Sequence, residues 1–199
     1  MFTDRGASAV LDDGDLPPQL IDGACLLHVS AYSLFSETSR HAVLDLWTLA
    51  SDAGLERTVD PCSVAGLEAV GRDAFLDWTE GASVAFPNLD EGRLLTGADE
   101  PDEIVDALLD RYRIAALKLG ASGVLAASRS GERVRLSAPA VVGVDSTGAG
   151  DAFCAGFLTA VLADAGLERA AACGMAAAAR AVLTIGGRPR PHALPTMDQ

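Results

Sequence analysis

Short apolar runs and helical patterns alternate along most of this chain. Residues 25–30 form an apolar run between turn residues, which is typical of a buried strand. Residues 38–53 carry apolar side chains at near-helical spacing, and the pattern stops at Gly54 as a helix does. Residues 57–60 are predicted to form a second strand, which Pro61 ends. This alternation indicates a parallel sheet with helices on its faces.

The same alternation continues to the end of the chain. A helix is predicted over residues 64–80, and a strand over residues 83–86 is closed by Pro87. We see no internal repeat and no low-complexity linker, so a single domain over residues 1–199 is expected. The proline-rich residues 188–199 are expected to be loosely held. Further helices are predicted over residues 90–95, 101–112, 148–163 and 167–183, and further strands over residues 114–119, 123–127 and 134–136.

Charge and composition exclude several classes of function. The formal net charge is −13, which disfavours a broad surface for nucleic acid or anionic lipid. An anionic substrate must therefore be bound by local groups. No signal peptide opens the chain and no apolar run reaches 18 residues, which argues against a membrane protein. The cysteines are scattered and never form a Cys-x-x-Cys pair, so buried thiols in a reducing cytoplasm are expected rather than a metal site: Cys25, Cys62, Cys154 and Cys173.

The most informative motif lies at Asp145-Ser146-Thr147-Gly148-Ala149-Gly150-Asp151, which runs directly into an apolar stretch. Gly148, Ala149 and Gly150 allow backbone N–H groups to converge at the start of a helix, where the helix dipole also favours an anion. Asp151 follows at the helix mouth and could take a proton from a hydroxyl group aimed at a bound phosphoryl group. The alternative is an ordinary strand-to-helix turn in which Asp151 only complements the dipole.

Two better-known phosphate motifs do not fit this segment. The chain has no Gly-x-x-x-x-Gly-Lys-Ser/Thr, and a Gly-x-Gly-x-x-Gly pattern that starts at Gly148 fails because Phe153 occupies its last position. A Walker-type NTPase and a dinucleotide-dependent dehydrogenase are therefore disfavoured.

The motif Asp145-x-x-Gly148-Ala149-Gly150-Asp151, followed by a helix rich in alanine, phenylalanine and glycine, closely resembles the C-terminal signature of the ribokinase-like carbohydrate kinases, the pfkB family. The resemblance implies an α/β fold, a three-layer α/β/α sandwich around a mostly parallel sheet. It also implies phosphoryl transfer from ATP, with Mg²⁺, to a hydroxyl group of a sugar or sugar acid. Asp151 would be the base, and the amides of Gly148, Ala149 and Gly150 would stabilise the transferred group.

Two further segments resemble elements of the same family. The pair Asn88 and Glu91 resembles an Asn-x-x-Glu element that organises magnesium and phosphate through water; the alternative is a capping box at a helix start. The segment from Lys118 to Gly123 resembles a strand and turn beside the nucleotide, where Gly120 and Gly123 would let the backbone approach ribose and phosphate. Lys118 would neutralise phosphate charge, or is a solvated lysine at a strand end.

The resemblance assigns roles at both ends of the last third of the chain. Gly186 and Gly187 lie where the family builds one wall of the adenine pocket; the alternative is a C-cap pair. The loop with Asp145 and Thr147 binds a monovalent cation in the family, often K⁺. A competing interpretation is that Asp145 only fixes the loop by hydrogen bonds to nearby N–H groups.

The start of the chain departs from the family pattern. Residues 1–8 resemble an internal strand that follows the glycine-rich sugar-binding segment and the small β lid, so an N-terminally truncated form of the fold is expected, either as a product of truncation or as a shortened homologue. Missing strands would leave a sheet edge that invites pairing with another chain, a homodimer included. Arg5 could contact an anionic acceptor. The alternative functions are a catalytically silent nucleotide-binding fragment or regulatory module, and a vitamin-type kinase of the same superfamily.

Overall fold

The computed structural model describes residues 10–187. They belong to two compact units, the first ending at Ser137 and the second beginning at Ala138. The expectations about residues 1–8, Arg5 and residues 188–199 lie outside the described residues. Among the described helices, none combines the length and the apolar character needed to cross a membrane.

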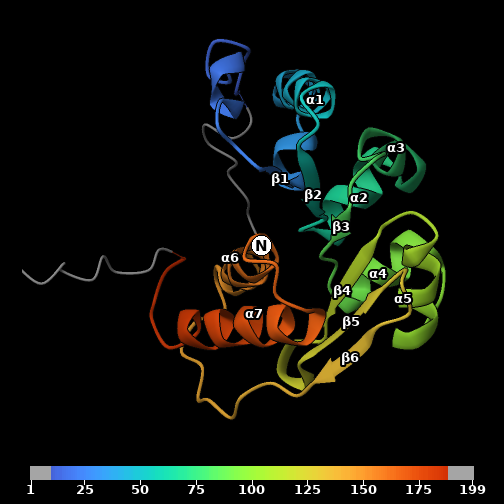
Figure 1. Ribbon diagram of the computed structural model, residues 1–199, viewed down its shortest axis with the longest axis vertical. Helices are drawn as coiled ribbons and strands as arrows, with labels where there is room; N and C mark the ends of the chain where they lie inside the picture. Colours follow the sequence, from blue (N-terminus) through green and yellow to red (C-terminus); the bar gives the residue numbers. More distant parts are fainter. Residues whose placement is uncertain (1–9, 188–199) are drawn as a thin grey trace, which may run out of the picture. The chain divides into compact units, whose positions relative to one another are not determined.

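The first unit is built on a six-stranded sheet with the spatial order β1-β2-β3-β4-β5-β6 (Figure 1). The first four strands pair in parallel, and the last two pair antiparallel. The predicted mostly parallel α/β sheet is therefore confirmed. Because parallel strands share one direction, the carboxyl ends of β1 to β4 lie at the same edge of the sheet. The strands are β1 (Leu26–Ser30), β2 (Glu56–Asp60), β3 (Val84–Ala85), β4 (Ile114–Lys118), β5 (Val124–Ser128) and β6 (Arg133–Leu136).

Helices connect the parallel strands, as the alternating pattern predicts. α1 packs against β1 and β2, and α5 packs against β4 and β5. The α-helices of this unit are α1 (Glu37–Asp52), α2 (Val64–Val70), α3 (Arg72–Trp78), α4 (Leu89–Thr96) and α5 (Pro101–Leu109), and short 3-10 helices occupy Pro18–Ile21, Ala31–Leu34 and Gly120–Ser122.

The single helix predicted over residues 64–80 is wrong. Two helices, α2 and α3, occupy this segment, and Gly71 lies between them with φ 90° and ψ 138°. This backbone conformation cannot continue a helix and is strained for residues other than glycine, so α2 ends here and α3 starts in a new direction. The helix predicted over residues 101–112 also ends earlier, at Leu109.

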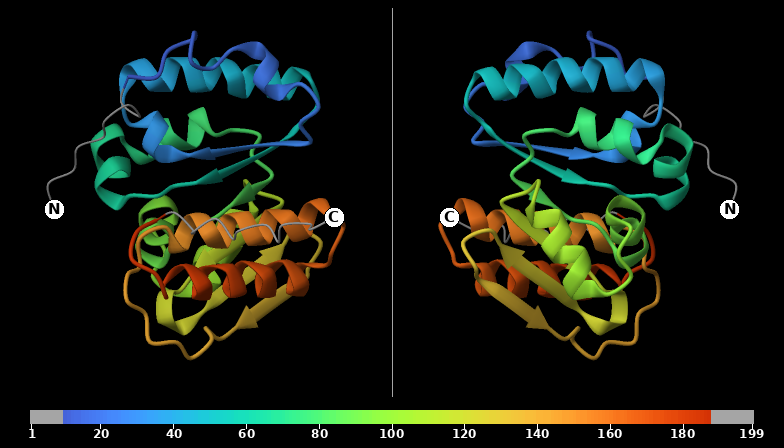
Figure 2. Two further views of the ribbon diagram at one scale, coloured as in Figure 1. Left: turned by 90° about the vertical axis from the view of Figure 1, so that its left-hand side faces the viewer. Right: turned by 90° about the vertical axis from the view of Figure 1, so that its right-hand side faces the viewer.

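The second unit contains two long helices, α6 (Ala149–Leu162) and α7 (Leu167–Ala181), which lie side by side in both views of Figure 2. Glycines permit their close approach. A Cβ atom at Gly156 would lie 2.6 Å from the Cys173 carbonyl oxygen, and one at Gly174 would lie 2.8 Å from the Phe153 ring. The small residues of this segment therefore serve helix-to-helix packing.

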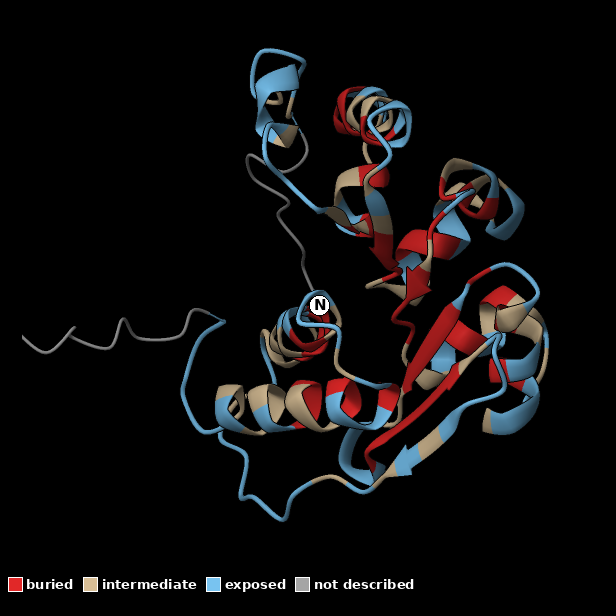
Figure 3. Cartoon of the chain, viewed as in Figure 1, coloured by how far each residue is buried: buried red, intermediate tan, exposed pale blue. Residues whose placement is uncertain are grey.

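The core of the first unit lies around the central strands, which are almost wholly buried in Figure 3. Val59 on β2 and Leu117 on β4 have no exposed surface, and neither have Phe75 and Phe86. Burial of each such side chain contributes about 1.5–3 kcal/mol relative to exposure. This packing holds the ends of the strands, and the polar residues on them, in fixed positions.

Substitution of Gly66 by alanine is expected to destabilise the first unit. Gly66 lies within α2, where alanine normally stabilises a helix by about 1 kcal/mol relative to glycine. A Cβ atom there would, however, overlap the buried Phe35 ring. Overpacking costs more than this gain, so we expect a net loss of about 1–2 kcal/mol in urea denaturation followed by tryptophan fluorescence. The same substitution in a Phe35→Leu background should be neutral or stabilising. Equal losses in both backgrounds would show that the ring is not the obstacle.

Candidate functional site

In the second unit, the turn before α6 requires glycine for two reasons. Gly148 precedes the helix with φ 78° in the left-handed region. A Cβ atom there would also lie 2.9 Å from both the Cα atom and the carbonyl oxygen of Gly187. The backbone before α6 is thus packed directly on the backbone that follows α7, and no larger residue fits without displacement.

The start of α6 presents backbone donors. Within residues 10–187, the N–H groups of Gly148 and Gly150 have no hydrogen-bond partner, as expected for the first turn of a helix. The N–H group of Ala149 instead donates to the Ser146 carbonyl oxygen at 3.2 Å. The side chain of Asp151, in the same first turn, is exposed. The turn can therefore receive an anion through Gly148 and Gly150, next to an accessible carboxylate.

Asp145 ties this turn to the segment after α7. Its Oδ1 atom accepts the Thr147 N–H at 2.9 Å, and its Oδ2 atom accepts the Gly186 N–H at 2.9 Å. The hydrogen bond from Gly186, followed by those from Thr147, lowers the pKa of this carboxyl group to about 2. These are the hydrogen bonds expected if Asp145 fixes the loop. The cation site at Asp145 and Thr147 stays a prediction, and so does the nucleotide role of Gly186 and Gly187.

In the first unit, Asn88 and Glu91 form a complete capping box at the start of α4. The Asn88 Oδ1 atom accepts the Glu91 N–H at 2.9 Å, while the Glu91 carboxylate accepts the Asn88 N–H at 2.8 Å and the Asn88 Nδ2 group at 2.7 Å. Glu91 is 1% exposed, and burial raises its pKa to about 7. The capping alternative is therefore realised. A role in holding a metal, through water, stays a prediction.

Lys118, the last residue of β4, is not the solvated strand-end lysine of the alternative interpretation. Its Nζ atom donates to Asp60 Oδ2 at 2.6 Å, and the two side chains are 16% and 5% exposed. Asp60 is the last residue of β2 and was missed by the sequence analysis. A polar residue at the carboxyl end of a buried parallel strand, followed by Pro61, is the signal that could have found it.

The two glycines predicted to approach a nucleotide both lie in the turn after β4, but their environments differ. Gly123 is buried, with φ 104°, and its N–H donates to the Gly120 carbonyl oxygen at 3.1 Å. Gly120 has φ 58°, and a Cβ atom there would meet open space. Gly123 therefore shapes the turn, and Gly120 leaves room beside it. Their contact with a nucleotide stays a prediction.

The cysteines carry no disulfide among the described residues, but the expectation that all are buried is wrong. Cys25 is exposed because it precedes β1, outside the packed strand. Cys62 follows β2 with φ 64°, and its Sγ atom lies 3.0 Å from Ser30 Oγ and 3.1 Å from the Asp60 carbonyl oxygen. Burial, with a smaller effect of the Asp60 charge, raises the pKa of the Cys62 thiol to about 12.

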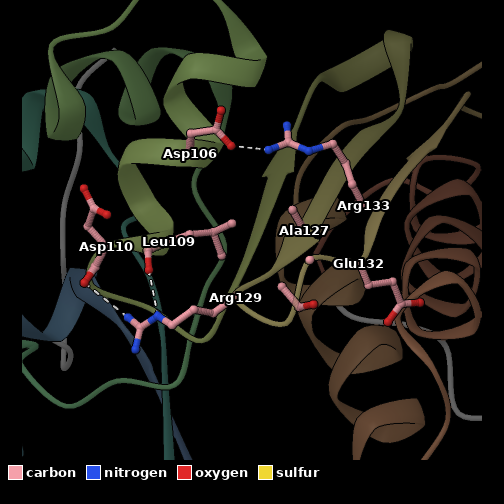
Figure 4. A pocket seen from close by; sticks show the side chains of 9 residues that line it. Asp106, Leu109, Asp110, Ala127, Arg129, Glu132 and Arg133 are labelled. Atoms are coloured by element: carbon pink, nitrogen blue, oxygen red, sulfur yellow. Dashed lines mark hydrogen bonds and ion pairs between the residues drawn. The ribbon is translucent and has the colours of Figure 1, made fainter.

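A hollow of about 310 Å³ in the first unit lies at the end of the sheet opposite to Lys118 (Figure 4). It is lined by the end of α5 and the turn between β5 and β6. Its Ser128 pairs with Ile114 at the start of β4, whereas Lys118 ends that strand. Arg129 donates to the carbonyl oxygens of Leu109 and Asp110, so its guanidinium group is engaged at the end of α5.

Comparison with known proteins gives these features a context. A family model described as pfkB family carbohydrate kinase matches residues 1–193. The fructokinase of Escherichia coli is 35% identical over 138 residues, which cover 67% of this chain and 45% of that protein. The solved adenosine kinase of Sinorhizobium meliloti has a TM-score of 0.83 at 25% identity, over 90% of this chain and 55% of the other. An E. coli structure assigned as ribokinase II, in complex with ATP and Mg²⁺, has a TM-score of 0.81 at 24% identity, over 89% of this chain and 58% of the other.

These similarities confirm the expected fold class, a ribokinase-like three-layer α/β/α fold with a mostly parallel sheet. The chain spans about half the length of the curated relatives it matches. The matched part covers 45% of the E. coli fructokinase and 51% of a fructokinase relative in Arabidopsis thaliana.

Substitution of Gly148 by alanine is expected to loosen the turn before α6. Alanine would carry both the strain of a positive φ and a clash with Gly187. The Gly186 amide, which Asp145 holds, should then exchange its hydrogen at least tenfold faster in mass-spectrometric exchange. Gly97→Ala is the matched control, since Gly97 has φ 77° but open space around its Cβ position. Unchanged exchange in Gly148→Ala would show that the close approach does not constrain the loop.

The Cys62 thiol is expected to resist alkylation at pH 8. A pKa of about 12 in place of the ordinary 9.0 leaves roughly a thousandfold less thiolate, which is the reactive form. Iodoacetamide labelling, read by peptide mass spectrometry, should modify the exposed Cys25 long before Cys62. In urea the difference should disappear. Labelling of Cys62 at the rate of Cys25 in the folded protein would contradict its assigned environment.

Proposed function

The chain belongs to the pfkB family of carbohydrate kinases, and from this premise we propose that it serves phosphoryl transfer from ATP to a hydroxyl group of a sugar or sugar acid. The observation that carries the proposal is the start of α6, where N–H groups without partners among the described residues stand beside the exposed carboxylate of Asp151. Phosphoryl transfer needs these two devices, a cradle for dispersed negative charge and an acceptor for the hydroxyl proton.

In this proposal Asp151 accepts the proton of the acceptor hydroxyl as that oxygen attacks phosphorus. The amides of Gly148 and Gly150 donate hydrogen bonds to the oxygens of the transferred group. Such donors contribute about 3–4 kcal/mol each to transition-state stabilisation in other enzymes. Ala149 contributes only if its hydrogen bond to Ser146 opens, so we assign the main role to the two glycines.

The first unit supplies groups suited to a metal-bound polyphosphate. Mg²⁺ would neutralise phosphate charge, and it retains several waters in protein sites. The carboxylate of Glu91 is buried and already hydrogen-bonded to Asn88, so this pair fits Mg²⁺ through bound water rather than directly. Lys118 would act on the phosphates, and Gly120 and Gly123 on the nucleotide. The related structure in complex with ATP and Mg²⁺ supports both ligands.

The remaining assignments complete the proposal for the second unit. Gly186 and Gly187 would form a wall of the adenine site. The close packing of Gly187 on the turn before α6 and the open space around the Cβ position of Gly186 support this proposal. Asp145 and Thr147 would hold K⁺ only with oxygens that are not engaged within the loop, since both Asp145 oxygens accept N–H groups.

The names of the relatives support a sugar hydroxyl as acceptor. Fructokinase, ribokinase and adenosine kinase all act on a sugar or a sugar-bearing compound, and this favours a carbohydrate kinase over a vitamin-type kinase. A cytoplasmic location and a homodimer stay predictions. For the homodimer, the supporting observation is that β1 pairs with one strand only among the described residues.

A catalytically silent nucleotide-binding module is the second candidate function. It is favoured by one observation, that candidate ligand groups already bond within the protein: Asn88 bonds to Glu91, and both Asp145 oxygens accept N–H groups of the loop.

Substitution of Asp151 by asparagine is expected to abolish transfer and spare nucleotide binding. Loss of a general base typically costs about 10²–10⁴-fold in rate, whereas the amides that contact phosphate remain. The measurements are ADP formation with fructose, ribose, adenosine and a ketosugar acid, and ATP affinity by calorimetry.

Asp164→Asn is the matched control for this prediction. Asp164 is exposed in the loop after α6, and asparagine tolerates its φ of 56°. Full transfer activity in Asp151→Asn would refute the assignment of the base. ATP binding by the native chain without transfer to any acceptor would instead favour the silent module.

A further inference from the structure

We propose that Asp60 is a positioning residue that holds the Lys118 ammonium group in place at the carboxyl edge of the sheet for the phosphate groups of a nucleotide. The inference rests on the proposed function and extends it to a residue that none of the assignments above includes. Asp60 itself carries a negative charge and would repel phosphate, so it acts through Lys118.

The first argument is the burial of this ion pair. The Lys118 and Asp60 side chains are 16% and 5% exposed, and their charged atoms are 2.6 Å apart. In every other ion pair among the described residues the basic side chain is at least 36% exposed. A buried pair costs desolvation and often stabilises a fold no more than apolar residues would, so stability alone is a weak reason for this one.

The second argument is the strand geometry that makes the pair. β2 and β4 are separated by β3, which ends at Ala85 and is only two residues long. β4 continues to Lys118, beyond its last residue paired with β3, which is Ala115. The early end of the middle strand allows the Lys118 side chain to reach Asp60 on the far strand. Both residues end their strands, at the edge where open α/β sheets place ligands.

The third argument is that Asp60 is held from both sides. Its Oδ1 atom accepts the Cys62 N–H at 3.2 Å, and its Oδ2 atom accepts the Lys118 ammonium. The carboxylate therefore has a defined orientation before any ligand binds. The Lys118 backbone is held as well, since its N–H donates to the Pro87 carbonyl oxygen at 2.8 Å, next to Asn88.

Charge gives the pair its function. The chain has a net charge of −13, so its long-range field repels a nucleotide, and a local cation must receive the phosphates. A lysine side chain without its counterion is free to turn toward solvent. The hydrogen bond to Asp60 Oδ2 holds the Lys118 ammonium group at the edge of the sheet instead.

The test compares ATP with adenosine, which lacks phosphates, by calorimetry in the presence of Mg²⁺. Asp60→Asn keeps the shape of the side chain and removes its charge. We expect it to weaken ATP binding roughly tenfold, as for loss of one charge-assisted hydrogen bond, and to change adenosine binding less than twofold. Lys118→Met should show the same loss. The double variant should lose no more than either single one, because both act through one ammonium group.

Glu56→Gln is the matched control. Glu56 is the first residue of β2, and it pairs at 3.0 Å with Arg113, just before β4, at the opposite edge of the same sheet. Both of these side chains are about half exposed, so this substitution should leave ATP and adenosine binding unchanged. Circular dichroism checks that each variant is folded. If Asp60→Asn does not fold, Lys118→Arg, which keeps the charge, should retain ATP binding within threefold where Lys118→Met does not.

Three results would overturn the inference: unchanged ATP binding in Asp60→Asn, equal losses for ATP and adenosine, and additive losses in the double variant. Equal losses would indicate a purely structural pair. Absence of ATP binding by the native chain would overturn the proposed function together with this inference, so the two failures are distinguishable.

Discussion

Parallel pairing of β1 to β4 is the constraint on which the chemistry of the first unit depends. Because these strands share one direction, residues far apart in the sequence end at one edge of the sheet, and Asp60 and Lys118 meet there although 58 positions separate them. A buried core beneath the edge fixes the strands and lets a desolvated ion pair persist. The pattern of apolar runs therefore determines where polar groups can gather.

The second unit depends instead on contact between two backbone segments, the turn before α6 and the segment after α7. Gly148 and Gly187 pack so closely that no larger residue fits at Gly148, and Asp145 joins the two segments through both of its oxygens. The turn is thus held in shape before a ligand arrives, which lowers the cost of ordering it on binding. Preorganised amides at a helix start are well suited to a group whose negative charge is spread over several oxygens. The chain belongs to the pfkB family, and the phosphoryl transfer proposed above would use this turn.

An acidic protein repels anionic ligands at long range, so it must bind them through local groups. The local groups that we propose for this task are a helix start, a capping box that would hold a metal through water, and a lysine held by a buried carboxylate. Each combines a structural role with a chemical one. Asn88 and Glu91 begin α4, and Asp145 fixes a loop, so the structural interpretations of these residues and the functional proposals are compatible rather than exclusive.

The sequence by itself determined the mostly parallel α/β class, the order of its elements and the turn at Gly148, because apolar periodicity and glycine requirements are local properties of a chain. It also located the Asn88–Glu91 cap, whose partners are three residues apart. The break at Gly71, the pairing of Lys118 with Asp60 and the exposure of Cys25 were decided only by the tertiary structure. The ion pair depends on which strands lie beside one another, and the other two features depend on where a helix turns and where a strand begins. Long-range packing sets all three, and local spacing does not contain it.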